Sequence, residues 1–431
     1  MNNIFKNTTL GLQHVLAMYA GAVIVPLIVG KTLGLSSEEL TYLVAIDILM
    51  SGVATILQVM SNRFFGIGLP VVLGCTFTAV GPMISIGDGY GISSIYGAII
   101  VSGIFVILIS GFFGKLVKFF PPVVTGSVVT IIGITLIPVA INNMAGGQGA
   151  EDFGSTQNVL LSFGTLIFIV LLYRFSTGFI KAISILIGIL VGTIAAYFMG
   201  ILDFSAVKEA DLFHMIQPFY FGTPTFDWSP ILTMTLVAIV SLVESTGVYF
   251  ALGDMLGKKL QKEDLSKGYR AEGIAVLLGG IFNSFPYTTF SQNVGLMQMS
   301  GVKTRKVIYI AGGMLILLGF IPKISSLTTI IPEAVLGGAM IAMFGMIISQ
   351  GIKMLSTIIS DSKSPDNAMI IACSVGIGLG VTVVPDIFQS LPESLQILTS
   401  NGIVAGSFTA IVLNILFNMI PSRYKKTSDT I

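Results

Sequence analysis

The sequence predicts an all-α membrane protein with fourteen transmembrane segments, and three observations support this fold class. Of the 431 residues, 54% are hydrophobic and only 10% are charged, whereas a soluble globular chain carries about 25% charged residues. Fourteen stretches have the apolar character needed to cross a hydrocarbon core about 30 Å thick. Basic residues gather on one side of the membrane when these stretches are threaded through it in turn. Lipid is therefore expected to cover most of the surface.

The fourteen predicted segments differ in regularity. Most have the pattern of continuous apolar helices, but the third and the tenth are interrupted by proline and glycine, so neither is expected to be one continuous helix. These two interrupted segments cover residues 66–82 and 284–295. The fourteen segments begin near residues 9, 41, 64, 92, 119, 157, 179, 230, 271, 286, 305, 329, 367 and 402.

The basic residues predict the orientation of the chain. With both termini in the cytoplasm, all of the 22 lysines and arginines fall on the cytoplasmic side except Lys31, Lys208 and Lys323. Short cytoplasmic loops collect Lys and Arg, and missing one span would scramble the pattern downstream. The sequence therefore predicts an even number of spans in a multi-pass protein of the cell membrane, with both termini cytoplasmic.

An internal repeat divides the segments into two halves of seven. Residues 120–127 open the fifth segment, and the similar residues 331–338 open the twelfth. Because each half has an odd number of spans, the second half must be inverted relative to the first. The interrupted third and tenth segments are also seven apart, and such a pair at matching positions indicates the binding site of a transporter. Residues 203–229 are expected to link the halves on the external side.

A few ionisable residues are predicted to lie within the spans or at their ends. Such a side chain costs about 2.5–3.5 kcal/mol at the centre of a helix, so it is retained only where it faces protein or water. Glu244 lies deep in the eighth span with no basic residue near it in the sequence, so we expect it to take up and release a proton. The ionisable residues of this kind are His14, Asp47, Glu244, Glu272 and Glu333.

Each of these residues also has a purely structural interpretation, as a polar group hydrogen-bonded between helices. That interpretation is preferred for Asp47 and Glu333. His14 fits a relay or site-shaping role and a hydrogen-bonded core histidine equally well. Glu272 fits a conformational or proton role, and almost equally a salt bridge or a favourable charge at a helix N-terminus.

The interrupted segments also carry uncharged side chains that suit a planar ligand. Gln292 and Asn293 lie where the tenth segment breaks, and their amides can present donors and acceptors to the edge of a heterocycle. The alternative is that they only satisfy backbone groups freed by the break. Phe77, in the third segment, is a candidate for stacking on a planar ring.

Other classes of function lack support. A net charge of +1 leaves no broad basic face for nucleic acid. Gly30 to Thr32 resemble the end of a nucleotide-binding loop, but Val25 stands where its first glycine belongs. The sequence has no metal-spaced Cys/His cluster and no HExxH or GxSxG motif. No enzyme activity, metal or cofactor is therefore predicted.

The string Gln292-Asn-Val-Gly-Leu-Met-Gln-Met-Ser-Gly301 resembles the signature of the nucleobase-ascorbate transporter family, Q/E/P-N-x-G-x-x-x-x-T-R/K/G. It departs from the signature only at Ser300, which keeps the hydroxyl group of threonine. The resemblance extends along essentially the whole chain. Its other matching positions are Gln13 and His14 in the first span, Glu244 in the eighth and residues 271–273 in the ninth.

This resemblance implies a specific architecture. The third and tenth segments would each contain a short extended stretch, and the substrate would bind where the two cross. A core domain of spans one to four and eight to eleven would move against a gate domain of spans five to seven and twelve to fourteen. Related carriers form homodimers, so a homodimer is implied as well. The core domain would cover residues 1–113 and 230–322, the gate domain 114–202 and 323–431, and the external linker 203–229.

The resemblance also implies which residues act. Gln292 is typical of members that take xanthine or uric acid, whereas uracil carriers often have glutamate at that position. Val248 departs from the polar residue that characterised relatives commonly have four positions after the eighth-span glutamate, Glu244. The implied substrate contacts are Glu244, Gln292, Asn293, Phe77, Ser291 and Thr76, and the residues implied in proton coupling or conformational change are Glu244, Glu272 and His14.

These observations together predict a secondary active transporter that imports a purine nucleobase, xanthine first among them, by proton symport with alternating access. Its expected partners are the purine and the lipid bilayer, and its expected coupling ion is H+, with Na+ as the alternative. The alternative functions are transport of uracil, another nucleobase or uric acid, and anion exchange by the same architecture. A passive channel is disfavoured because the polar residues cluster near one depth.

Overall fold

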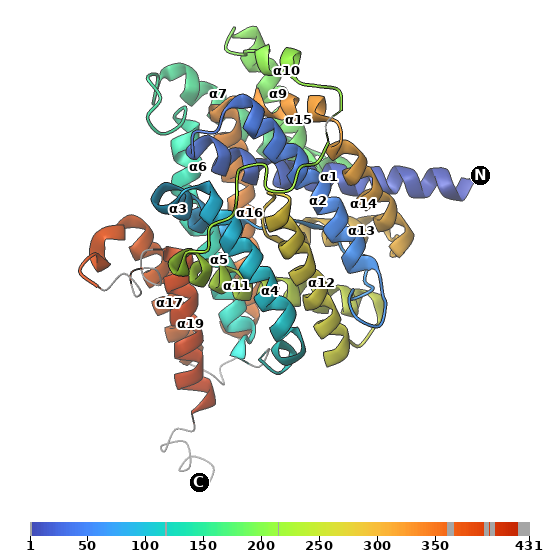
Figure 1. Ribbon diagram of the computed structural model, residues 1–431, viewed down its shortest axis with the longest axis vertical. Coiled ribbons are helices and arrows are strands. Elements are labelled where there is room, and N and C mark those ends of the chain that lie inside the picture. Colours follow the sequence, from blue (N-terminus) through green and yellow to red (C-terminus); the bar gives the residue numbers. More distant parts are fainter. Residues whose placement is uncertain are drawn as a thin grey trace. The chain divides into compact units, whose positions relative to one another are not determined.

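A computed structural model describes residues 2–116, 119–213, 215–359, 366–391, 396 and 401–420. In these residues the chain is mostly helical, with two short strands (Figure 1). Position 214 of the predicted linker and residues 421–431 of the predicted cytoplasmic C-terminus lie outside the described residues. The elements are α1 (Asn2–Thr32), α2 (Ser37–Val59), β1 (Leu73–Cys75), η1 (Phe77–Ala79), α3 (Val80–Tyr90), α4 (Ile92–Leu116), α5 (Pro122–Thr135), α6 (Ile137–Met144), α7 (Thr156–Phe175), α8 (Gly178–Ala182), α9 (Ser184–Phe198), α10 (Ser205–Glu209), α11 (Trp228–Leu256), α12 (Lys262–Ile281), β2 (Tyr287–Thr289), α13 (Ser291–Ser300), α14 (Arg305–Gly319), α15 (Pro322–Thr329), α16 (Glu333–Ile359), α17 (Asp366–Val383), η3 (Pro385–Phe388), α19 (Gly402–Asn414) and η4 (Ile415–Met419).

Many of these helices suit a membrane. Among the described residues, nine helical stretches are long and apolar enough to cross one, and α14 with α15, bent by 80° at their junction, make a tenth if they count as one span. The prediction of a largely helical, multi-pass membrane protein is confirmed. The count of fourteen segments and the discontinuity of the third and tenth stay predictions. The nine stretches lie in α1, α2, α4, α5 with α6, α7, α11, α16, α17, and α19 with η4.

The described chain forms two compact units. One comprises the described residues within Met1–Gly114 and Ile137–Met343, and the other comprises those within Lys115–Leu136 and Phe344–Ile431. The smaller unit is built on α5, α17 and α19, which pack on one another. Asn401 caps α19 by accepting hydrogen bonds from the backbone N–H groups of Ile403 and Val404, at 3.0 and 3.3 Å. The predicted division into core and gate domains stays a prediction.

Within the larger unit, α2 runs along α14 (Figure 1). Small residues allow this close approach: a Cβ atom on Gly52 would lie 2.5 Å from the carbonyl oxygen of Gly312. A capping box fixes where α2 begins, because Ser36 Oγ accepts from Glu39 N–H at 3.3 Å while the Glu39 carboxylate accepts from Ser36 N–H at 2.9 Å. The long helix that carries Asp47 therefore has a defined start and a close-packed face.

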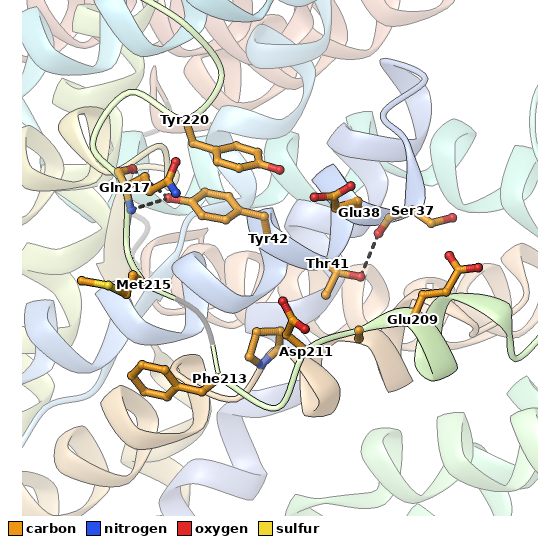
Figure 2. Close-up of a pocket in the computed structure, with 12 residues that line it drawn as sticks. Ser37, Glu38, Thr41, Tyr42, Glu209, Asp211, Phe213, Met215, Gln217 and Tyr220 are labelled. Carbon is orange, nitrogen blue, oxygen red and sulfur yellow. Dashed lines mark hydrogen bonds between the residues drawn. The ribbon is translucent and has the colours of Figure 1, made fainter.

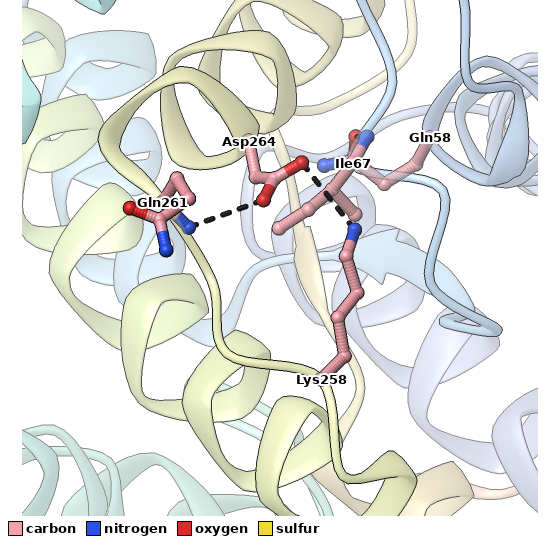
Figure 3. Close-up of polar contacts among 5 residues, drawn as sticks. All are labelled: Gln58, Ile67, Lys258, Gln261 and Asp264. Atoms are coloured by element: carbon pink, nitrogen blue, oxygen red, sulfur yellow. Dashed lines mark hydrogen bonds and ion pairs between the residues drawn. The ribbon is translucent and has the colours of Figure 1, made fainter.

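A polar cluster defines the start of α12, which carries Glu272. Asp264 accepts hydrogen bonds from Gln261 N–H at 3.1 Å and from Lys258 Nζ at 3.3 Å, so it caps the helix and pairs with a cation in the preceding loop (Figure 3). Nearby, Gln58 Oε1 accepts from the backbone N–H of Ile67 at 3.3 Å. This second bond ties the end of α2 to the segment that leads into β1.

Candidate functional site

Extended residues from the two interrupted segments lie side by side. Strands β1 and β2 pair antiparallel, with Leu73 opposite Thr289 and Cys75 opposite Tyr287. The pairing continues at both ends, where Thr76 N–H donates to the Pro286 carbonyl at 2.9 Å and Phe290 N–H donates to the Val72 carbonyl at 3.0 Å. All six strand residues are buried. Mutual pairing thus satisfies backbone groups that would otherwise be exposed inside a membrane protein.

A helix begins directly after each strand. η1 and α3 follow β1, and α13 begins at Ser291, two residues after β2 ends. The first N–H groups of a helix have no partner within it and carry a partial positive charge. Thr76 caps η1, since its Oγ1 accepts from Thr78 N–H at 3.2 Å. Two helix N-termini therefore flank the strand pair, an arrangement suited to carbonyl oxygens or anionic groups of a ligand.

Helix α11 packs against β2, η1 and α13. It carries Glu244, which is half-buried and lies beside the Thr78 side chain of η1. The next residue, Ser245, bonds to β2: its Oγ lies 3.2 Å from Thr288 Oγ1 and accepts from Thr289 N–H at 3.4 Å. The structure therefore brings Glu244 to the strand crossing.

Asn293 and His14 are joined directly. The side-chain nitrogen of Asn293 lies 3.1 Å from His14 Nδ1 and 3.0 Å from the His14 carbonyl oxygen. Both side chains are buried. Asn293 Oδ1 has no hydrogen-bond partner among the described residues. The fourth turn of α1 and the first turn of α13, which the sequence places nearly 280 residues apart, therefore meet beside the strand pair.

Glu272, on α12, lies in a buried polar network that includes Tyr249 of α11, the helix that carries Glu244. Tyr249 Oη donates to Glu272 Oε1, and Gln58 Nε2 bonds to Tyr249 Oη as well as to the Gly268 carbonyl at 3.0 Å. The carboxyls of Glu272 and Glu244 are close enough to interact electrostatically. The network thus spans α2, α11 and α12 and reaches the neighbourhood of Glu244.

The remaining predicted residues take different positions. Phe77, the first residue of η1, is buried, and Thr76 is fully buried. Ser291 is exposed and Gln292 is half-buried. Gln292 makes no side-chain hydrogen bond to any residue that the structure describes. Its amide can therefore bond to a ligand without first breaking a bond within the protein.

Glu333, for which a structural role is preferred, lies away from these residues at the start of α16. Its carboxylate lies over Gly147, where an added Cβ would come within 1.7 Å of an oxygen of Glu333. The neighbouring Lys31 donates from Nζ to the Ile331 carbonyl at 3.1 Å.

Phe290 packs beside the strand pair, and no pattern in the sequence indicated this position. Its ring packs on the bare backbone of two glycines: a Cβ on Gly74 would lie 2.3 Å from the ring, and a Cβ on Gly21 would lie 2.6 Å from it. Phe290 immediately precedes α13 and is buried. Ser245 was also missed, although its position beside Glu244 in an apolar helix was the available signal. Phenylalanine is too common in this chain, with 29 copies, for Phe290 to stand out.

A cavity with a volume of about 460 Å³ lies elsewhere. It is lined by residues from the start of α2 and from the predicted external linker, and by Pro322 of α15 (Figure 2). Tyr42 and Tyr220 stack in it with ring centroids 3.7 Å apart, and Tyr42 Oη donates to the Gln217 carbonyl at 2.9 Å. None of the predicted substrate contacts lines this cavity.

Comparison with known proteins identifies the family. Residues 5–387 match the model of a family described as a permease family. The chain is 68% identical to the xanthine permease of Bacillus subtilis (strain 168) over 425 residues, which is 99% of this chain and 96% of that protein. It is 61% identical to the uric acid permease PucK of the same organism over 416 residues, 96% of each protein.

A solved structure shares the fold. The transmembrane domain of a cyanobacterium bicarbonate transporter, BicA, has a TM-score of 0.64 and 17% sequence identity, covering 88% of this chain and 97% of that one. At this identity the likeness concerns the fold alone. The match to the family model, by contrast, covers nearly the whole chain and agrees with the signature at residues 292–301. The chain therefore belongs to the permease family, the nucleobase-ascorbate transporter family that the signature predicts, and it is a membrane transporter and not an enzyme.

Proposed function

We propose that this chain imports a purine nucleobase, xanthine first among them, by proton symport with alternating access. The observation that supports this proposal is the set of polar groups beside the strand pair. Glu244 comes from α11, and Gln292 and Asn293 come from the first turn of α13, which packs against α11. A purine has a planar ring with donors and acceptors along its edge, which this set can match. Relatives named xanthine permease and uric acid permease support the same substrate class.

In this proposal the base binds beside β1 and β2. Gln292 and Glu244 hydrogen-bond to its edge, Phe77 stacks on its ring, and the N-termini of η1 and α13 face its carbonyl oxygens. Thr76, Ser291 and Asn293 shape the site. Most of these side chains are attached to short elements on either side of the strand pair, so a small shift of the strands changes the whole set together.

The proton step is assigned to Glu244. A carboxyl among apolar helices is more stable when neutral or when a ligand compensates its charge. Proton uptake by Glu244 would accompany binding of the base, and release of both would follow once the site opens to the cytoplasm. Glu272 and His14 adjust this step through their contacts with the Glu244 region and Asn293. Na+ is the alternative coupling ion.

The transport cycle requires moving parts. We assign residues 1–113 and 230–322 to a core domain and residues 114–202 and 323–431 to a gate domain, joined by an external linker at 203–229. The proposal also includes fourteen membrane-spanning segments, of which the third and the tenth are discontinuous. Both termini lie in the cytoplasm, and two copies of the chain form a homodimer. The shared fold alone would also suit an anion exchanger, since the BicA domain has it as well. The polar side chains at residues 244, 292 and 293 favour a nucleobase.

An uptake panel tests the proposal. Cells that lack their own purine carriers and express this chain are given radiolabelled xanthine, uric acid, guanine, hypoxanthine and uracil, with and without a protonophore. We expect saturable xanthine uptake that the protonophore abolishes. Preference for uric acid would support the alternative suggested by the relative PucK. Uptake of none of the five bases, with the protein present in the membrane, would contradict the proposal.

A further inference from the structure

Asp47 is buried in the middle of α2, against the segment that leads into β2. Its side chain has 0% exposure. Oδ1 accepts a hydrogen bond from the backbone N–H of Phe285 at 3.1 Å. Tyr287 Oη lies 3.5 Å from the same oxygen, but its shorter bond, 2.7 Å, is to Ser284 Oγ. Because a hydroxyl has one proton to donate, Phe285 N–H is the firm donor to Asp47.

The position of this bond matters because the backbone has few donors just before β2. Residue 286 is proline, which has no N–H. Its carbonyl already accepts from Thr76 N–H of the other interrupted segment. The N–H of Phe285 is therefore the last donor before the strand, and a side chain from α2 accepts it.

The opposite end of β2 is held in the same manner by another helix. Ser245 of α11 accepts from Thr289 N–H and bonds to Thr288 Oγ1. In addition to its pairing with β1, this strand of three residues is thus anchored by a helix side chain near each end. α13 begins only two residues after β2, so any shift of the strand moves Gln292 and Asn293 with it.

We propose that Asp47 is a positioning residue for substrate recognition: by accepting the Phe285 N–H bond it sets the place of β2 and hence of Gln292 and Asn293. This inference rests on the proposed purine transport and assigns a role that the sequence did not suggest. The role needs an acceptor oxygen at Oδ1 and does not need a charge. An asparagine can therefore fulfil it, whereas alanine or leucine cannot.

The experiment compares Asp47→Asn, Asp47→Ala and Asp47→Leu with the unchanged protein. Ser51→Ala is the matched control, because Ser51 lies one turn further along α2, is fully buried and has a hydroxyl without a partner among the described residues. Membrane abundance is measured by immunoblot, and initial rates over a range of xanthine concentrations give KM and Vmax. Leucine is included because alanine leaves a cavity.

We expect Asp47→Asn and Ser51→Ala to keep KM within about twofold, and Asp47→Ala and Asp47→Leu to raise KM about tenfold or more, as when a buried N–H loses its acceptor. Vmax per transporter should change much less than KM. Loss of uptake in Asp47→Asn would overturn the proposal, since the carboxyl itself would then be needed. Unchanged KM in Asp47→Ala or Asp47→Leu would also overturn it.

Asp47→Ala and Asp47→Leu could both be absent from the membrane while Asp47→Asn is present at the normal level. Asp47 would then be needed for folding and not for recognition, and this result would also overturn the proposal. The unchanged protein is assayed in parallel. If it takes up no xanthine, the proposed substrate is wrong, and the same KM comparison is made with whichever base the uptake panel identifies.

Discussion

The side-chain nitrogen of Asn293 donates to His14 Nδ1 at 3.1 Å and to the His14 carbonyl oxygen at 3.0 Å. An amide nitrogen has only protons to offer, so Nδ1 must be the acceptor and the ring proton of a neutral His14 belongs on Nε2. His14 therefore determines how the Asn293 amide is turned. The amide oxygen, with no partner among the described residues, is left available as an acceptor.

This relationship predicts that His14 acts through Asn293. His14→Leu removes one of the two bonds that orient the amide, which is worth about 0.5–1.5 kcal/mol, or roughly a 2- to 12-fold rise in the KM for xanthine. Asn293→Ala should raise KM further. The double variant should be little worse than Asn293→Ala alone, because the two residues share one interaction. Additive effects in uptake assays would contradict the assignment.

Replacing Glu244 by Gln should reduce proton-driven xanthine uptake to background while the protein remains in the membrane. The amide keeps the shape of the side chain but cannot take up a proton at the strand crossing. Ser241→Ala is the control, since Ser241 lies on the same helix and is buried without a partner among the described residues. Full uptake by Glu244→Gln that a protonophore still abolishes would refute the role of Glu244.

Gly74→Ala should weaken the binding of xanthine. The new Cβ would lie 2.3 Å from the ring of Phe290, so either the ring or β1 must move. Overpacking of this kind costs about 1–3 kcal/mol. Gly89→Ala in α3 is the control, because its Cβ would meet nothing within 4 Å. We expect Gly74→Ala, but not Gly89→Ala, to melt at a lower temperature in detergent than the unchanged protein and to be stabilised less by added xanthine. If the two variants have equal melting temperatures and equal stabilisation by xanthine, the packing argument is wrong.

Tyr249→Phe should destabilise the protein by about 1–3 kcal/mol, because the buried Glu272 carboxyl and the Gln58 amide both lose the hydroxyl between them. Tyr96→Phe provides a matched control: Tyr96 is equally buried, yet its hydroxyl has no partner among the described residues. Thermal unfolding in detergent gives the melting temperature of each variant. A melting temperature for Tyr249→Phe that equals that of Tyr96→Phe would show that the network contributes little.

Much of the architecture could be predicted because membrane insertion imposes strong local patterns. Apolar runs indicate helices, and proline with glycine marks residues 66–82 and 284–295 as irregular. The structure has strands at residues 73–75 and 287–289, inside both stretches. Their pairing and register depend on contacts between distant parts of the chain, which no local pattern encodes.

The candidate site is harder to predict than the architecture, because its side chains meet only through contacts between distant parts of the chain. Glu244, Gln292 and Asn293 stand out because polar groups are costly in a membrane. The role proposed for Asp47 could not be predicted, because the backbone N–H that it accepts from belongs to Phe285, 238 residues away in the sequence. Phe290 and Ser245 became visible only once the glycines and the strand that they contact were in place.

The strand pair also constrains the order in which the molecule can assemble. Leu73 and Thr289 are 216 residues apart, so β1 leaves the ribosome long before its partner exists. Until then the N–H and C=O groups of β1 lack their final partners in a medium that offers few replacements. A fragment that ends before residue 287 cannot build the site, however well its helices insert. Substrate recognition is consequently a property that the chain acquires late in its synthesis, when the second half has entered the membrane.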